Sequence, residues 1–267
     1  MTVDFKSLTL SVCDVARQAG AFIRQERRQF SPESIERKHA HDYVSYVDKQ
    51  SEQRIVSALR SLLPEAGFIT EEGSATHTDE QYCWVVDPLD GTTNFIHGFP
   101  PYAISIALRQ CGQTVLGVVY EICADECFYA WQNGGSYVDG QPLKVSTSPL
   151  SDALLCFQLP YDSDAYSPMA QHLVRQFYGR AASIRMLGSA AIALCYVAAG
   201  RLDAYAEKYI GQWDYMAGTI IVSEAGGTCT NYEGSDDFTE GNSIVATNGL
   251  IHQDILESIG DYLDWQH

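Results

Sequence analysis

One apolar run constrains the fold of this chain more than any other feature. It spans Tyr82–Val86 without alternation and ends at Asp87. A strand of this kind is buried on both faces, so other elements must cover both sides of its sheet. Helical periodicity before the run and alternating strand and helix patterns after it supply those elements. We therefore expect layered α and β structure in one unit, residues 1–267, with approximate lobes 1–145 and 146–267.

The remaining elements follow from apolar periodicity and from breaker residues. Helices are predicted around residues 8–22, 45–63, 166–178, 189–199 and 214–225, with a last helix that reaches about residue 262. Strands are predicted at 68–70, 82–86, 153–158, 183–186, 203–206 and 243–246, and an antiparallel meander at 102–138. Polar loops are expected around 31–42 and at 74–80.

Composition narrows the classes of partner. The formal net charge of −17 argues against nucleic-acid binding, which normally needs a basic face. A phosphate substrate would also be repelled unless metal ions reversed the local charge. No apolar stretch is long enough for a membrane span, and the N-terminal residues do not resemble a secretory signal, so we expect a cytoplasmic protein without membrane contact.

The cysteines do not indicate a metal site. There are 8 of them and no CxxC pair, so zinc binding is not expected. Several lie in apolar runs, which predicts buried free thiols in a reducing compartment. The 7 histidines show no pairing that suggests catalysis, and His97 is expected at the surface of a short helix.

The segment after the apolar run carries the chemistry. Asp87 ends the strand, Pro88 fixes the backbone, and Asp90 follows, so both carboxylates can point out of one tight turn. Gly91 permits close backbone approach, and Thr92 and Thr93 can cap a helix whose first amides would face an anion. Paired carboxylates beside such amides can hold hard cations together with a phosphate. The same residues could also be ordinary turn and cap residues.

Other acids favour the metal interpretation. Glu71 ends one predicted strand much as Asp87 ends the next, so neighbouring strands could deliver carboxylates to one sheet edge. Like charges there would repel each other unless cations bind. Asp214 begins an apolar helix, where capping alone would explain it, and Asp48 in a first helical turn would by default be solvated.

These segments resemble the inositol monophosphatase family. Its first signature is matched by residues 87–95 (DPLDGTTNF), and its second by 213–218 (WDYMAG) running on to 224–227 (EAGG). Residues 188–191 (GSAA) and 202–205 (LDAY) match between them, and Lys38, Asp42, Asp48 and Glu71 match upstream. Ser45 departs from the threonine of many members, with little effect expected. The resemblance covers nearly the whole chain and implies an αβαβα sandwich.

The resemblance also assigns roles to individual residues. It implies two or three magnesium ions, the first on Glu71, Asp87 and the Leu89 carbonyl, the second on Asp87, Asp90 and Asp214, and a weaker third at Glu71. Glu71 and the Thr92 hydroxyl would orient the attacking water, with Asp48 bonded to that threonine. The implied substrate contacts are Gly91, Thr92, Gly188, Ser189, Ala190, Glu207 and Asp214, with Lys38 as a possible additional charge.

The resemblance thus implies hydrolysis of a small phosphate monoester, foremost myo-inositol monophosphate, by a lithium-sensitive homodimer. A haloacid-dehalogenase-type phosphatase is disfavoured, because its nucleophilic aspartate would stand at Pro88. The same metal motif serves bisphosphate nucleotides, fructose 1,6-bisphosphate and histidinol phosphate in other branches, and these substrates remain open. A catalytically silent binding protein on this fold is the other alternative, disfavoured because every implied metal ligand is present.

Overall fold

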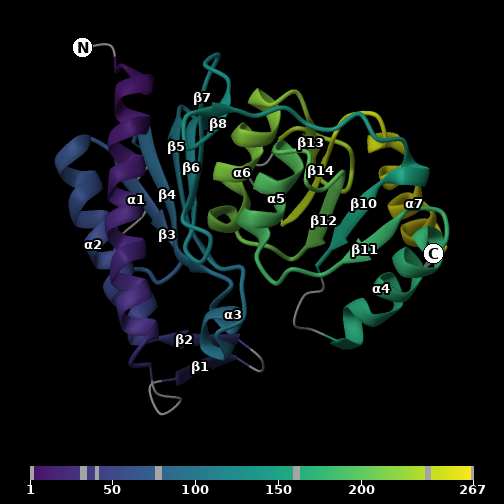
Figure 1. Cartoon of the computed structure of the whole chain (residues 1–267), viewed down its shortest axis with the longest axis horizontal. Coiled ribbons are helices and arrows are strands. Elements are labelled where there is room, and N and C mark those ends of the chain that lie inside the picture. Colours follow the sequence, from purple (N-terminus) through teal and green to yellow (C-terminus); the bar gives the residue numbers. More distant parts are fainter. Residues whose placement is uncertain are drawn as a thin grey trace.

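The chain folds into stacked layers of helices and sheets. The structure is a computed structural model, and it describes residues 3–30, 35–39, 42–75, 80–158, 163–237 and 242–265. A pair of helices, a sheet, a second pair of helices, a second sheet and a third pair of helices follow one another across the molecule (Figure 1). The layered αβαβα arrangement implied by the sequence is therefore confirmed. The division into lobes near residue 145 stays a prediction.

The first sheet contains the strand that the apolar run Tyr82–Val86 predicted. Its order is β3-β4-β5-β6-β7-β8-β9. β3 (Gly67–Thr70) and β4 (Tyr82–Asp90) are parallel, and every later pair is antiparallel, as expected for a meander. The later strands are β5 (Ala103–Gln110), β6 (Gln113–Glu121), β7 (Glu126–Trp131), β8 (Ser136–Val138) and β9 (Gln141–Pro142). All of β4 is buried, because helices cover both faces of this sheet.

Two long helices cover the outer face of the first sheet: α1 (Phe5–Arg27) and α2 (Tyr46–Leu62). α1 begins after Asp4, whose carboxylate accepts the N–H groups of Lys6 and Ser7 at 3.1 and 3.3 Å. The apolar stripes of both helices pack on the sheet in one cluster that includes Trp84 and Ile104. Burial of these stripes fixes the helices, as their apolar periodicity predicted.

The second sheet has the order β11-β10-β12-β14-β13. Its strands are β10 (Leu154–Phe157), β11 (Ser183–Arg185), β12 (Ala204–Lys208), β13 (Thr228–Thr230) and β14 (Ser243–Thr247). β10 runs parallel to both β11 and β12, whereas β14 is antiparallel to its neighbours. α4 (Ser163–Phe177) and α7 (His252–Trp265) lie on its outer face (Figure 1).

The middle layer consists of α5 (Ala190–Ala198) and α6 (Gln212–Glu224), which lie between the sheets. Eight of the nine residues of α5 are buried. A helix covered by a sheet on each side must be apolar all round, and both sequences satisfy this requirement. The first turns of both helices lie beside the end of β4, and they build one wall of the site described below.

Several short elements, among them β1, β2 and β13, were not predicted from the sequence. β1 (Ile35–His39) and β2 (Asp42–Ser45) form an antiparallel hairpin where a loop was predicted. Charged residues at 36–38 hide the alternating pattern on which strand prediction relies. β13 was missed because three residues carry too little periodicity. Residues 31–34, 40–41 and 76–79 of the two predicted loops lie outside the described part of the chain.

The cysteines agree with the prediction of free thiols. None is paired in a disulfide, six are buried, and Cys111 and Cys123 are exposed. Among the helices described, none is both long enough and apolar enough to cross a membrane.

One glycine sets the distance between the first sheet and the middle layer. A Cβ on Gly117 of β6 would lie 2.5 Å from the carbonyl oxygen of Ala217 and 2.9 Å from its Cα. Since this neighbour is backbone of α6, it cannot turn away. We expect Gly117→Ala to lower the free energy of unfolding by about 1–3 kcal/mol in urea titrations.

Gly260→Ala in α7 is the matched control. A Cβ there would meet nothing within 4 Å. Because alanine has a higher helix propensity than glycine, this substitution should leave the free energy of unfolding unchanged or raise it by up to about 1 kcal/mol. If Gly117→Ala proved as stable as the wild type, the close contact between β6 and α6 would be contradicted.

Candidate active site

The ends of β3 and β4 deliver two carboxylates to one edge of the first sheet. The strands are parallel, with Thr70 opposite Val86, so Glu71 and Asp87 follow at the same edge. The backbone N–H of Glu71 donates to the carbonyl oxygen of Val86 at 3.2 Å, which continues the pairing into the turn. The expectation that two neighbouring strands bring their acids together is confirmed.

A bulge places Asp87 and Asp90 on one side of the chain. Asp87 pairs with Ser105 of β5 and Asp90 pairs with Ala103, so β4 carries one more residue than its partner over this interval. In a regular strand, the side chains of residues three apart point to opposite faces of the sheet. The extra residue of the bulge turns the side chain of Asp90 to the same face as that of Asp87. The N–H of Leu89 donates to Asp87 Oδ1 at 2.8 Å and holds this turn.

Asp214 reaches the same point from the second half of the chain. It lies in the first turn of α6, where its Oδ2 accepts the N–H of Gly211 at 2.8 Å. The carbonyl oxygen of Trp213 accepts a hydrogen bond from Ser105 Oγ at 2.9 Å, which anchors this helix start to β5 opposite Asp87. Asp214 is therefore a cap residue, as one reading of the sequence held, and also a member of the acidic cluster.

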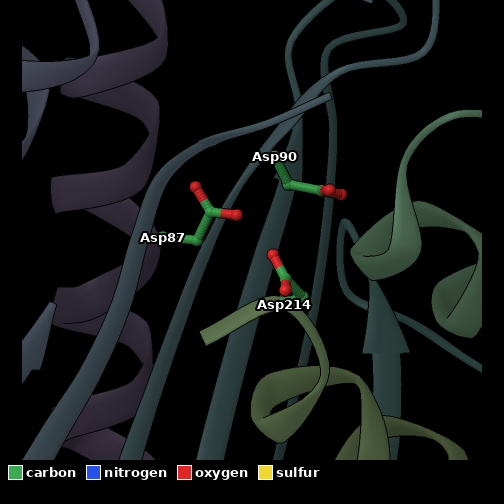
Figure 2. A group of neighbouring side chains, drawn as sticks. All are labelled: Asp87, Asp90 and Asp214. Atoms are coloured by element: carbon green, nitrogen blue, oxygen red, sulfur yellow. The ribbon is translucent and has the colours of Figure 1, made fainter. Parts of the chain in front are cut away.

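Three carboxylates converge as a result. One oxygen from each of Asp87, Asp90 and Asp214 lies within 4.8 Å of the other two (Figure 2). Asp87 is 1 % exposed and Asp90 is 7 % exposed. Glu71 lines the same cavity, and its charge contributes to the environment of Asp87 and Asp214.

Asp90 joins β4 to the middle layer. Its carboxylate accepts the hydroxyl of Ser189, the N-cap of α5, and the backbone N–H groups of Ala190 and Ala191 at 3.2 and 2.9 Å. Two of the residues assigned by resemblance to substrate contact, Ser189 and Ala190, thus hold Asp90. The N-terminus of a helix favours a carboxylate in this position.

The cluster carries a large electrostatic cost. Burial raises the pKa of Asp87 and Asp214 well above the ordinary range, and the neighbouring carboxylates raise it further. Burial also raises the pKa of Asp90 to about 6, although the hydrogen bonds from Ser189, Ala191 and Ala190 oppose this shift. Burial raises the pKa of Glu207, across the cavity, to about 8, against the hydrogen bond donated by Tyr205.

These residues fit a hard divalent cation. The donors are carboxylate oxygens, which Mg²⁺ prefers, and they point at one place. None of the described residues that line this cavity is lysine or arginine. The described part of the cavity walls thus supplies negative charge without a basic side chain, and a bound metal ion would provide positive charge there.

A hydrogen-bonded pair lies behind the acidic cluster. Thr92 Oγ1 lies 2.9 Å from Asp48 Oδ1 and 2.9 Å from the carbonyl oxygen of Leu89. The other oxygen of Asp48 accepts the N–H and hydroxyl of Ser45 at 2.9 and 2.6 Å. Burial raises the pKa of Asp48, although these hydrogen bonds oppose the shift. Asp48 is fully buried, so its default reading as a solvated residue was wrong, whereas its predicted bond to Thr92 is present.

The wall beside Thr92 depends on two glycines. Gly91 has φ +85, and a Cβ on it would lie 3.1 Å from the carbonyl oxygen of Gly188. α3 (Thr92–His97) follows Gly91, and Asn94 of this helix donates to the carbonyl oxygens of Leu187 and Pro101 at 2.8 Å each. These contacts hold the 187–188 turn against the end of β4.

The cavity enclosed by these elements has a volume of about 310 Å³, at the small end of ligand sites. Its walls contain most of the predicted site residues: Glu71, Asp87, Leu89, Asp90, Gly91, Thr92, Gly188, Ser189, Ala190, Glu207 and Asp214. Asp48 is not among them, since it lies behind Thr92. Lys38 belongs to β1, but its side chain is outside the described part of the structure.

The sequence assigned no metal-binding, catalytic or substrate-binding role to several other lining residues. Thr93, Gln158, Tyr209, Ile210, Gly211 and Trp213 also face the cavity. Gln158 follows β10, which runs parallel to β12, so it lies at the same sheet edge as Glu207. The strand predicted at 153–158 was a usable signal for this residue. Nothing in the sequence pattern marked Tyr209.

Removal of one charge should stabilise the metal-free protein. In the folded state these carboxyl groups have a raised pKa, so their ionisation costs stability as the pH rises from about 4, the value for an unfolded aspartate. Asp214→Asn keeps an oxygen for the Gly211 N–H and removes the charge. We expect it to raise the free energy of unfolding in EDTA by about 1–2 kcal/mol at pH 7.5, and by less near pH 4.

In magnesium, the wild type should be more stable than Asp214→Asn, the reverse of their order in EDTA. The ion stabilises the wild type by binding only the folded state, and this gain should shrink in Asp214→Asn. Glu65→Gln removes an exposed charge far from the cluster. It should change neither the free energy of unfolding in EDTA nor the stabilisation by magnesium. A variant less stable than wild type in EDTA would contradict the repulsion described here.

Comparison with known proteins agrees with this geometry. A sequence model of the inositol monophosphatase family matches residues 4–263. A Pseudomonas aeruginosa protein named Nus factor SuhB is 40% identical, over 93% of this chain and 94% of its own length. A Mesorhizobium japonicum inositol-1-monophosphatase is 35% identical, over 91% and 92%. The crystal structure of the extragenic suppressor protein SuhB from Bartonella henselae superimposes with a TM-score of 0.90 at 33% identity, over 95% and 98%. The chain therefore belongs to the inositol monophosphatase family and is a phosphatase.

Proposed function

We propose that this chain hydrolyses the phosphate monoester of a small alcohol, with myo-inositol monophosphate as its main substrate and magnesium as its metal. One observation carries the proposal: three carboxylates, two buried and one partly buried, meet beside the Thr92–Asp48 pair in a cavity of about 310 Å³. A cavity of this size suits a single phosphorylated ring. The name of the Mesorhizobium relative supports inositol monophosphate as that ring.

The proposed metal ligands are those implied by the sequence. Glu71, Asp87 and the Leu89 carbonyl would hold one ion, Asp87, Asp90 and Asp214 a second, and Glu71 a weaker third. Bound cations would neutralise phosphate oxygens, lower the pKa of the attacking water and stabilise the leaving alkoxide. The convergence of the three aspartates supports the second set most directly.

Glu71 and Thr92 would orient the water. Asp48 accepts hydrogen bonds from Ser45 through one oxygen and faces the Thr92 hydroxyl with the other. When the hydroxyl of Thr92 donates to Asp48, its oxygen can accept a hydrogen bond from the water. The water oxygen would then form the new bond to phosphorus and release one proton to solvent. The bond from phosphorus to the ester oxygen breaks, and that oxygen departs with the electron pair and takes up a proton from solvent water. No covalent enzyme intermediate is needed.

The phosphate and the alcohol would occupy different walls of the cavity. The N–H groups of Gly91 and Thr92 are proposed to hold the phosphate, while Gly188, Ser189, Ala190, Glu207 and Asp214 would contact the alcohol. Because Ser189 and Ala190 hold Asp90, we propose that they act mainly by fixing that carboxylate. The position of Glu207 across the cavity, hydrogen bonded to Tyr205, supports a contact with a substrate hydroxyl.

Other expectations drawn from the sequence and from the family resemblance stay predictions. They are the homodimer, the lithium sensitivity, the location in the cytoplasm and the role of Lys38. The Pseudomonas relative is named as a Nus factor, which indicates another role for that protein. The net charge of −17 argues against direct nucleic-acid binding by this chain.

Thr92→Ala should lower kcat by roughly 10²-fold, since the water loses one of its orienting groups. Thr92→Ser, which keeps a hydroxyl beside Asp48, should retain most of the activity. The rate of phosphate release at saturating magnesium and substrate measures kcat for both variants. Equal rates for Thr92→Ala and wild type would remove Thr92 from the proposed mechanism.

A panel of phosphate esters tests the substrate. We expect the highest kcat/KM for myo-inositol 1-phosphate, and lower values for a 3′,5′-bisphosphate nucleotide, fructose 1,6-bisphosphate and histidinol phosphate. A clear preference for the nucleotide would replace the proposed substrate. Absence of phosphate release from every ester, with magnesium present, would contradict catalysis and leave the silent binding protein as the better description.

A further inference from the structure

Tyr209 is an aromatic residue at the mouth of the cavity that none of the assigned roles uses. It lies in the short connection between β12 and α6, two residues after Glu207 and five before Asp214. It lines the cavity, yet the residue is 55% exposed. The protein core therefore does not require its ring, and the reason for an aromatic residue must be sought on the side of the cavity.

The backbone at Tyr209 is strained. Its φ of +63° lies in the left-handed region, which a bulky side chain adopts only at a cost in free energy. The other described non-glycine residues with positive φ are Cys111, Asp125, Asn133 and Asp139. All four lie in hairpin turns of the first sheet, where turn geometry demands this conformation. Tyr209 differs from them in both its size and its place beside the site.

Neighbouring contacts hold the strained connection in place. The carbonyl oxygen of Asn242 accepts the N–H groups of both Tyr209 and Ile210, at 2.5 and 3.2 Å. Ile210 is buried in the core cluster between the sheets. The ammonium group of Lys208 lies 5.5 Å from the centroid of the Tyr209 ring. The connection is thus fixed on both sides of Tyr209, and its ring has a defined position at the cavity mouth.

We infer that Tyr209 is a specificity-determining residue whose ring packs against the alcohol part of the substrate. This inference rests on the proposed phosphatase function. The phosphate would be held deep in the cavity beside Thr92, so the alcohol extends toward the mouth. A flat aromatic surface there packs well on the face of a ring and poorly on a short flexible chain. Tyr209 therefore favours esters of ring-shaped alcohols over esters of acyclic ones.

Substitution by glycine separates this role from folding. Tyr209→Gly removes the ring and relieves the left-handed strain, so its Tm should equal or exceed that of wild type. Tyr209→Phe keeps the ring and loses only the hydroxyl. Cys111→Gly is the matched control, because it relieves the same kind of strain in a hairpin turn outside the cavity.

The measurement is the ratio of kcat/KM for myo-inositol 1-phosphate to that for glycerol 2-phosphate, with magnesium. In Tyr209→Gly we expect this ratio to fall about 5- to 10-fold, chiefly through a higher KM for the ring ester. Tyr209→Phe and Cys111→Gly should keep the wild-type ratio. An unchanged ratio in Tyr209→Gly would overturn the inference.

The same experiment separates this inference from the proposed function. If the wild type released phosphate from neither ester, the proposed function itself would fail. If it hydrolysed both and Tyr209→Gly kept the wild-type ratio, only the role of Tyr209 would fail. A ratio that fell equally in Tyr209→Gly and Tyr209→Phe would assign selection to the phenol hydroxyl and overturn packing by the ring.

Discussion

The structure depends on a cluster of carboxylates, two buried and one partly buried, whose charges repel one another. Asp87, Asp90 and Asp214 place oxygens within 4.8 Å of one another, and burial raises the pKa of all three. Without a cation this arrangement opposes folding, so the rest of the molecule must supply the free energy that holds it. The three apolar clusters packed against the two sheets, one of which contains buried residues of both middle helices, provide that free energy.

The backbone positions these acids through rigid elements. The bulge in β4 turns Asp87 and Asp90 to one side, the N-terminus of α5 holds Asp90, and Ser105 of β5 holds the start of α6 beside Asp87. Each carboxylate thus has a backbone N–H donor that fixes at least one of its oxygens. A metal site built on such supports needs little rearrangement when the ion binds.

Sequence alone predicted this site better than its surroundings. Carboxylates at strand ends are local signals, so Glu71, Asp87 and Asp90 stood out from the sequence pattern. Asp214 joined them only through the family resemblance, because capping alone would explain an aspartate at a helix start. The burial of Asp48 was not predictable in the same way, because it depends on α2 packing across the end of β4 toward Thr92. Tyr209 was not predicted as a site residue for a related reason. Backbone strain and a position at the cavity mouth leave no pattern in the composition or spacing of the sequence.

The two halves of the cavity obey different constraints. Around the acids, a change of one residue alters charge, bulge or close packing at once, as Gly91 against Gly188 illustrates. At Tyr209, the side chain lines the mouth of the cavity with 55% of its surface exposed, and the carbonyl oxygen of Asn242 holds the backbone, so the residue can vary without disturbing the metal ligands. Chemistry and selection are therefore separable in this fold: the sheet edge fixes the reaction, and the connection before α6 selects the alcohol.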